Sequence, residues 1–319
     1  MPPTTHPFST GSLLDTASLS RAEILHLLSD ARRFAVPRSN ELLATAPGKT
    51  VALLFYEAST RTRISFEFAA KSIGAVTTIV TANVSSIDKG ESLIDTGLTL
   101  QALGSDSIVI RHPSAGASHA LARTLRIPVI NAGDGTHEHP TQALLDAYTL
   151  LQHRPSLDRL RITIVGDILH SRVTRSNLHL LVKLGAQVTL CGPEALLPDG
   201  FRDIVDYEYR AQVTIQRELD NALSNADAVM MLRIQKERLE GFEVDLATYV
   251  RDYQLNSERR GRADPDLLIM HPGPMIRGLE ISSEVADGLG SLVLEQVTNG
   301  VFIRRSVLAR ALQRDSDER

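Results

Sequence analysis

The spacing of hydrophobic and polar residues predicts alternating strands and helices over the first 140 residues. Short apolar runs predict strands at residues 50–56, 76–80, 107–110 and 128–130. Helical patterns at residues 91–103 and 117–125 separate the later runs. Strands and helices that alternate in this way indicate a parallel sheet covered by helices.

Two further helices are predicted, one before and one after the first apolar run. Ser20 and Glu23 form a capping box, which marks the start of a helix. The second helix follows the motif Ser59-Thr60-Arg61-Thr62-Arg63, and we expect its inward face to carry Ile64, Phe68 and Ala69.

The strand pattern begins again after a predicted connecting helix that starts at His139-Pro140 and runs to about residue 153. Strands are expected at residues 161–165, 187–190, 213–215, 227–232 and 267–270, a helix at 172–184, and closing helices over 287–312. We therefore predict an α/β protein of two domains, each a parallel sheet flanked by helices, joined by long helices. The domain change falls near residues 140–155.

The composition of the chain excludes several classes of function. The chain has 319 residues, which suits about two domains, and its formal net charge is −4. This charge gives no electrostatic case for nucleic acid or an anionic membrane as partner. The single cysteine, Cys191, excludes an internal disulfide and a multi-cysteine metal site. No secretory signal or membrane span is visible, so we expect a cytoplasmic enzyme or small-molecule binder.

Polar residues follow most of the predicted strands. In open α/β sheets, ligands bind beyond the carboxyl ends of the strands. The segments at these positions are 59–63, 85–89, 111–112, 134–142, 167–172, 233–235 and 271–274. Most of them hold cationic or hydrogen-bonding side chains, which predicts a site for an anionic ligand.

The segment from Ser59 to Arg63 has the chemistry of a phosphate cradle. A helix N-terminus offers free N–H groups, the hydroxyls add donors, and guanidinium groups match phosphate oxygens. The alternative is a simple Ser/Thr cap with two solvated arginines. Arg61 and Arg63 cannot point in the same direction on a helix, so we expect one of them to have a structural role.

Nucleotide and metal sites are not favoured. Gly48-Lys49-Thr50 precedes a strand, whereas a P-loop lysine follows one, and no G-x-G-x-x-G motif follows any strand. His137-Glu138-His139 would need a histidine at Thr141 to form the zinc-binding motif H-E-x-x-H. We therefore predict neither a metal nor a cofactor.

The remaining strand-end residues suit a small anionic substrate. His139 and Gln142 share one helix face and could donate to a carbonyl oxygen. Arg111 could add a guanidinium, although a structural ion pair is an equal alternative. Arg172 and Arg233 suit two carboxylates.

Taken in order, these motifs resemble the aspartate carbamoyltransferases over residues 8–312. The resemblance rests on STRTR, the loop from Ser85 through Lys89 to Glu91, Arg111-His112-Pro113, HPTQ at 139–142, GDILHSRV, LRIQKER and HPGP at 271–274. STRTR and HPTQ alone would mark only the wider transcarbamylase family. Ornithine enzymes of that family typically carry His-Cys-Leu-Pro where this chain has His-Pro-Gly-Pro.

The resemblance implies a role for each matching residue. The donor site for carbamoyl phosphate would comprise Ser59, Arg61, Thr62, Arg111, His139, Gln142, Pro272, Gly273 and Pro274, with Arg61, Thr62, Arg111 and His139 catalytic. The aspartate site would comprise Lys89, Arg172, Arg233 and Gln235. The first domain would span residues 1–140 plus 296–319, and the second residues 141–295.

The implied reaction transfers the carbamoyl group to the amine of L-aspartate, an early step of pyrimidine biosynthesis, without cofactor or covalent enzyme intermediate. In the family, Ser85 and Lys89 reach into the site of a neighbouring subunit of a homotrimer. A larger assembly with a regulatory or dihydroorotase-like chain is also compatible. Asp88 and Gly273 depart from some members, which have lysine and leucine there.

Other functions are compatible with parts of the pattern. A two-domain protein that binds an anionic amino acid without chemistry would need the same arginines, but not the cradle with His139 and Gln142. A transcarbamylase with another amine acceptor is a second alternative. A nucleotide-dependent dehydrogenase is the third.

Overall fold

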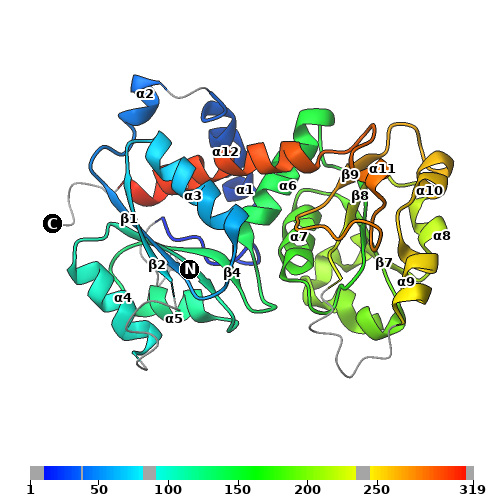
Figure 1. Ribbon diagram of the computed structural model, residues 1–319, viewed down its shortest axis with the longest axis horizontal. Helices are drawn as coiled ribbons and strands as arrows, with labels where there is room; N and C mark the ends of the chain where they lie inside the picture. The colour runs from blue at the N-terminus through cyan, green and yellow to red at the C-terminus, as the bar shows by residue number, and fades with distance from the viewer. Residues whose placement is uncertain (1–10, 37–38, 82–90, 235–244, 314–319) are drawn as a thin grey trace. The chain divides into compact units, whose positions relative to one another are not determined.

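The computed structural model describes residues 11–36, 39–81, 91–234 and 245–313. The chain divides into two compact units (Figure 1). Unit 1 comprises residues 1–18, 22–144 and 297–319, and unit 2 comprises residues 19–21 and 145–296. Each unit contains one sheet.

The sheet of unit 1 is parallel and has the strand order β2-β1-β3-β4. Its strands are β1 (Thr50–Phe55), β2 (Val76–Thr81), β3 (Ser107–His112) and β4 (Val129–Asp134). The central strands are apolar on both faces because helices cover both sides of the sheet. Leu54 of β1, for example, lies in register with Ile110 of β3, and both are buried.

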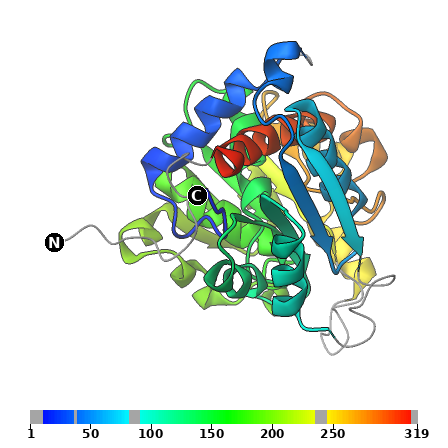
Figure 2. The same ribbon diagram turned by 90° about the vertical axis from the view of Figure 1, so that its left-hand side faces the viewer.

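Helices cover the two faces of this sheet (Figures 1 and 2). On one face lie α4 (Leu93–Ala102) and α5 (Ala117–Thr124), where Leu121 packs against β3. On the other lie α3 (Thr60–Ser72) and the unit 1 part of α12 (Val293–Leu312). Arg304 and Arg305 of α12 donate to Ser65 and Ser72 of α3, both at 2.8 Å. The remaining helices of this unit are α1 (Arg21–Arg33) and α2 (Asn40–Leu43). Helix α6 (Pro140–His153) begins in unit 1 and continues into unit 2.

The sheet of unit 2 is also parallel, with the order β7-β6-β5-β8-β9. Its strands are β5 (Arg161–Val165), β6 (Gln187–Cys191), β7 (Val213–Gln216), β8 (Ala228–Met231) and β9 (Leu268–Met270). Its helices are α7 (Arg172–Lys183), η3 (Glu194–Leu196), η4 (Asp199–Ile204), η5 (Tyr207–Gln212), α8 (Leu219–Leu223), α9 (Leu246–Tyr253), α10 (Ser257–Arg262) and α11 (Ser283–Ala286). Val165, Met231 and Ile269 form part of its core.

The predicted fold class is confirmed, because both sheets are parallel and flanked by helices. The expected inward position of Ala69 is confirmed, but that of Phe68 is wrong, since Phe68 is 61% exposed. Besides Ala69, α3 buries Thr62 and Phe66. These three positions follow the helical spacing of three and four residues, which leaves residue 68 on the outer face. The closing helix α12 begins at Val293, later than the predicted residue 287.

Within the described parts of the chain, no helix combines the length and the apolar character needed to cross a membrane.

Candidate active site

The carboxyl ends of three adjacent strands lie along one edge of the unit 1 sheet. β3 lies between β1 and β4, and Phe55 of β1 is in register with Arg111 of β3. His112 of β3 is in register with Asp134 of β4. Because the strands are parallel, the segments that follow them leave the sheet at the same edge. The unit 1 segments predicted for the donor site, residues 59–63, 111–112 and 134–142, therefore follow strands that end at this edge.

The N-terminus of α3 presents polar side chains for which no other described residue is a hydrogen-bond partner. Ser59 occupies the N-cap position, but its side chain makes no capping hydrogen bond. Arg61 has no hydrogen bond or ion pair with any other described residue. Partial burial lowers the pKa of the Arg61 guanidinium. The free N–H groups of the first helical turn add donors, so this terminus can accept a phosphate.

Arg111 lies at the end of β3 and is half-buried. Its Nε lies 3.3 Å from Glu57 Oε2, and its guanidinium donates to the carbonyl oxygen of Ala132 at 3.3 Å. Sequence reasoning missed Glu57, although it lies two residues before Ser59 in the same strand-end segment. A substrate anion that binds Arg111 would compete with this carboxylate.

The segment after β4 carries His139 and Gln142. Both are buried, at 4% and 8% exposure, and His139 directly precedes α6. The carbonyl oxygen of His139 accepts from the N–H groups of Gln142 at 2.9 Å and Ala143 at 3.3 Å. These hydrogen bonds fix the backbone of His139 at the helix start. Buried polar side chains at this edge are suited to orient a small polar ligand.

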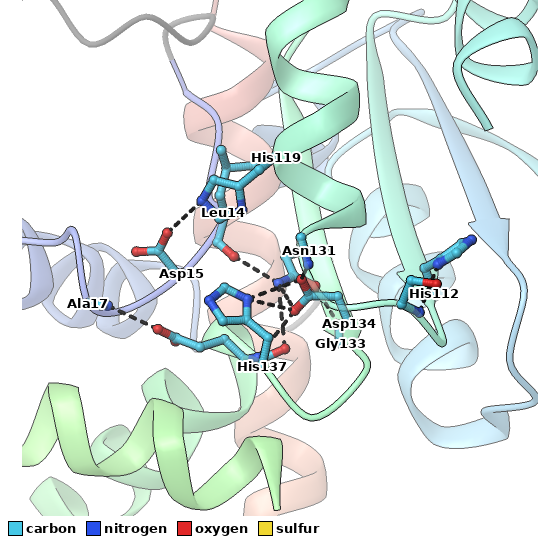
Figure 3. A network of polar contacts seen from close by, with 12 residues as sticks. Leu14, Asp15, Ala17, His112, His119, Asn131, Gly133, Asp134 and His137 are labelled. Carbon is cyan, nitrogen blue, oxygen red and sulfur yellow. Dashed lines mark hydrogen bonds and ion pairs between the residues drawn. The ribbon is translucent and has the colours of Figure 1, made fainter. Parts of the chain in front are cut away.

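A cluster of histidines and carboxylates lies beside the same segment (Figure 3). Potential metal-ligating atoms of His119, Asp134 and His137 lie within 4.8 Å of one another. Asp134 already accepts hydrogen bonds from the N–H of Gly116 at 2.7 Å and the amide of Asn131 at 2.8 Å. A metal would therefore have to share a carboxylate that the protein uses. The sequence motif at 137–139 supplies only one of these three candidate ligands.

Hydrogen bonding shifts the acidities in this cluster. Burial alone would raise the pKa of Asp134, but hydrogen bonds from His137 and Asn131 outweigh it and hold the pKa below its ordinary value. The hydrogen bond to Asp134 raises the pKa of His137. The pair is thus stabilised as imidazolium and carboxylate.

In unit 2, β8 lies between β5 and β9, so the segments that follow these three strands share one edge of the second sheet. Arg172 is the first residue of α7 after β5, and Arg233 follows β8 by two residues. Both are half-buried. Pro272, Gly273 and Pro274 follow β9.

Three other predicted site residues, Ser85, Lys89 and Gln235, lie outside the described residues.

A buried histidine holds the loop after β9 in place. His271 Nδ1 accepts from the N–H of Gly273 at 2.8 Å, so the imidazole proton resides on Nε2, which donates to Glu280 Oε1 at 3.1 Å. The side chains of His271 and Glu280 are both fully buried. Glu280 also accepts from the N–H of Ile276, which closes the loop around Pro274. Sequence reasoning missed Glu280, since it lies outside the HPGP motif.

Two models of known protein families match the chain. A family model described as "Aspartate/ornithine carbamoyltransferase, carbamoyl-P binding domain" matches residues 12–152. A second, described as "Aspartate/ornithine carbamoyltransferase, Asp/Orn binding domain", matches residues 158–311. The two matches together cover most of the chain.

Individual relatives are similar over nearly their whole length. An aspartate carbamoyltransferase catalytic subunit from Koribacter versatilis is 53% identical over 304 residues, which are 95% of this chain and 98% of the relative.

The chain is also similar to solved structures of carbamoyltransferases. Aspartate transcarbamoylase from Trypanosoma cruzi, in complex with N-(phosphonacetyl)-L-aspartic acid, has a TM-score of 0.83 at 31% identity, covering 95% of this chain and 96% of that one. Ornithine carbamoyltransferase from Pyrococcus furiosus has a TM-score of 0.84 at 27% identity, covering 94% and 96%. The chain described here belongs to the aspartate/ornithine carbamoyltransferase family.

Proposed function

We infer that this chain is an aspartate carbamoyltransferase, which converts carbamoyl phosphate and L-aspartate to N-carbamoyl-L-aspartate and phosphate. The observation that carries the inference most directly is the N-terminus of α3. There, the Ser59 hydroxyl and the Arg61 guanidinium have no protein partner among the described residues, beside a sheet edge that also holds Arg111 and His139. The similarity to aspartate carbamoyltransferase catalytic subunits supports aspartate as acceptor.

We assign the donor to the sheet edge of unit 1. The phosphate would bind Ser59, Arg61, Thr62 and Arg111, because hydroxyl, guanidinium and helix N–H groups all donate to phosphate oxygens. Thr62, Arg111 and His139 would face the carbonyl oxygen. The carbamoyl amide would be held by Gln142 and by the backbone around Pro272, Gly273 and Pro274. Residues 1–140 and 296–319 would form the donor-binding domain.

We assign aspartate to residues 141–295. Arg172 and Arg233 lie at one edge of the unit 2 sheet, and two guanidinium groups match two carboxylates. Lys89 and Gln235 would complete the aspartate site.

The proposed reaction is direct attack of the deprotonated aspartate amine on the carbamoyl carbon. The new C–N bond forms, the C–O bond to phosphate breaks, and phosphate leaves with the electron pair and takes up the proton that the attacking amine loses. Negative charge develops first on the carbonyl oxygen and then on the phosphate, so Arg61, Arg111 and His139 would act by electrostatic stabilisation. No covalent enzyme intermediate is required.

Exchange of the acceptor tests this function. The purified chain should form carbamoyl aspartate from carbamoyl phosphate and aspartate without any added cofactor. Ornithine in place of aspartate should give no product. Formation of carbamoyl ornithine would assign the chain to the ornithine branch, to which the Pyrococcus furiosus structure belongs. Binding of aspartate without any turnover would favour a binding protein.

We further propose that the active form is a homotrimer. β2 lies at one edge of the sheet, and Phe68, Val76 and Ile79 on α3 and β2 are 61%, 58% and 42% exposed. An edge strand with exposed apolar side chains suits an interface with another copy. Ser85 and Lys89 follow β2 in the chain, and they would enter the neighbouring site. A cytoplasmic location and a larger assembly with a regulatory or dihydroorotase-like chain stay predictions.

Mixing two inactive variants tests the shared site. Trimers that combine Lys89→Ala and Arg61→Ala chains should regain activity, because some sites would receive both intact residues. Verified mixed trimers that stay inactive would contradict site sharing.

A further inference from the structure

The residue before His139 is a glutamate whose carboxylate points away from solvent. Glu138 is 1% exposed and lies between the end of β4 and the start of α6. No step of the proposed reaction uses it. A carboxylate is buried at a cost unless hydrogen bonds compensate, so its partners indicate what it does.

Three hydrogen bonds to the carboxylate come from one segment near the start of the chain. Glu138 Oε2 accepts from the backbone N–H and from the hydroxyl of Thr16, both at 2.7 Å. Glu138 Oε1 accepts from the N–H of Ala17 at 3.2 Å. Thr16 and Glu138 are 122 residues apart in the chain. The side chain of Glu138 therefore ties the N-terminal segment to the loop that carries His139.

The backbone of Glu138 is fixed independently. Its N–H donates to Asp134 Oδ1 at 3.1 Å, and its carbonyl oxygen accepts from the N–H of Asp134 at 3.1 Å. Asn131 bridges the same elements, since its amide donates to Asp134 and to the carbonyl oxygen of Leu14, both at 2.8 Å. Glu138 is thus held at its backbone by β4 and at its carboxylate by residues 16–17.

We propose that Glu138 is a positioning residue for His139, and that residues Thr16 and Ala17 complete this support. The proposal rests on the proposed role of His139. His139 is the next residue along the chain and is itself buried, so a shift of Glu138 moves its backbone directly. Displacement of a substrate-orienting group by about 1 Å can reduce turnover about 100-fold. Loss of the Thr16 contact should therefore lower turnover although Thr16 never meets the substrate.

The test compares substitutions on both sides of the contact. Glu138→Gln keeps the shape of the side chain but places an amide where a carboxylate oxygen accepts. Thr16→Val removes only the hydroxyl donor, and Thr16→Ser restores it. Thr163→Val is the matched control, because the Thr163 hydroxyl is also buried and donates to a carbonyl oxygen, that of Ala222, in unit 2.

We expect kcat to fall at least tenfold in Glu138→Gln and measurably in Thr16→Val. The KM for aspartate should stay within twofold of its value in the chain without substitutions. Thr16→Ser should recover most of the lost kcat. Thr163→Val should lower thermal stability while kcat is retained. If Glu138→Gln does not fold, the Thr16→Val and Thr16→Ser pair carries the test.

If Glu138 and Thr16 only stabilise the fold, the kinetic result is different. In that case, the folded fraction of Glu138→Gln or Thr16→Val would keep kcat within twofold, and only stability would fall, as in the control. That outcome would overturn the proposal. The NMR signals of the His139 imidazole give a readout independent of turnover: they should shift in Glu138→Gln and not in Thr163→Val. If the chain without substitutions makes no carbamoyl aspartate, the proposed function is refuted. The NMR signals of His139 would still test whether Glu138 positions His139.

Discussion

Replacement of Ser59 by alanine separates substrate binding from helix stability. Serine at an N-cap normally stabilises a helix because its hydroxyl accepts from a backbone N–H, and its loss typically costs about 1 kcal/mol. The Ser59 hydroxyl makes no such hydrogen bond. We therefore expect Ser59→Ala to change the free energy of unfolding by less than about 0.5 kcal/mol, the range of surface substitutions.

The same substitution should weaken carbamoyl phosphate binding. A hydrogen bond to a charged group contributes about 1.5–3 kcal/mol. Since about 1.4 kcal/mol corresponds to a tenfold change in affinity, loss of the Ser59 hydroxyl should weaken binding about 10-fold to 150-fold. The KM for carbamoyl phosphate, and calorimetric binding of inorganic phosphate, would measure this change. Urea unfolding in phosphate-free buffer would measure stability.

Ser39→Ala is the matched control. The Ser39 hydroxyl caps α2 by accepting from the N–H of Leu42 at 3.2 Å. Its loss should lower the free energy of unfolding and leave the KM for carbamoyl phosphate unchanged. A Ser59→Ala chain that loses stability as a capping variant does, with unchanged phosphate binding, would refute the assignment of the hydroxyl to the substrate.

Three further predictions concern charge. Arg61→Ala should lower kcat by at least the ~10²–10³ typical of losing one oxyanion donor; near-normal turnover would remove Arg61 from the mechanism. Arg233→Ala should mainly raise the KM for aspartate, so an unchanged value in steady-state kinetics would contradict its assignment. Because the pKa of His137 is raised by Asp134, its contribution to stability is present below about pH 6.5 and is lost as pH rises through the raised pKa. His137→Gln should therefore reduce the free energy of unfolding more at pH 6 than at pH 9, and equal losses would argue against the ion pair.

Much of the fold could be predicted from the sequence because its central elements carry strong patterns. The apolar run at 161–165 and the helix from Pro140 have the same bounds in the structure as in the prediction. The short helices η3, η4, η5 and α8 were not predicted, since three to six residues are too few to show a helical period. Phe68 was misplaced because Ile64 and Phe68 are also one helical turn apart, so spacing alone does not decide which face of α3 is buried.

The site could be predicted only in part. Strand-end positions made Arg61, Arg111 and His139 candidates for the site, because a parallel sheet places such residues at one edge. Which strands are neighbours depends on the strand order, which no local pattern reveals. The contact between Glu138 and Thr16 is also hidden from local patterns, because it joins residues 122 positions apart and no sequence motif connects them.

A crystal structure of this chain with N-(phosphonacetyl)-L-aspartate tests the central claim most directly. The account predicts one bound molecule whose phosphonate contacts Ser59 and Arg61, and whose two carboxylates contact Arg172 and Arg233. A structure in which Arg61 and Arg172 contact no common ligand molecule would contradict it.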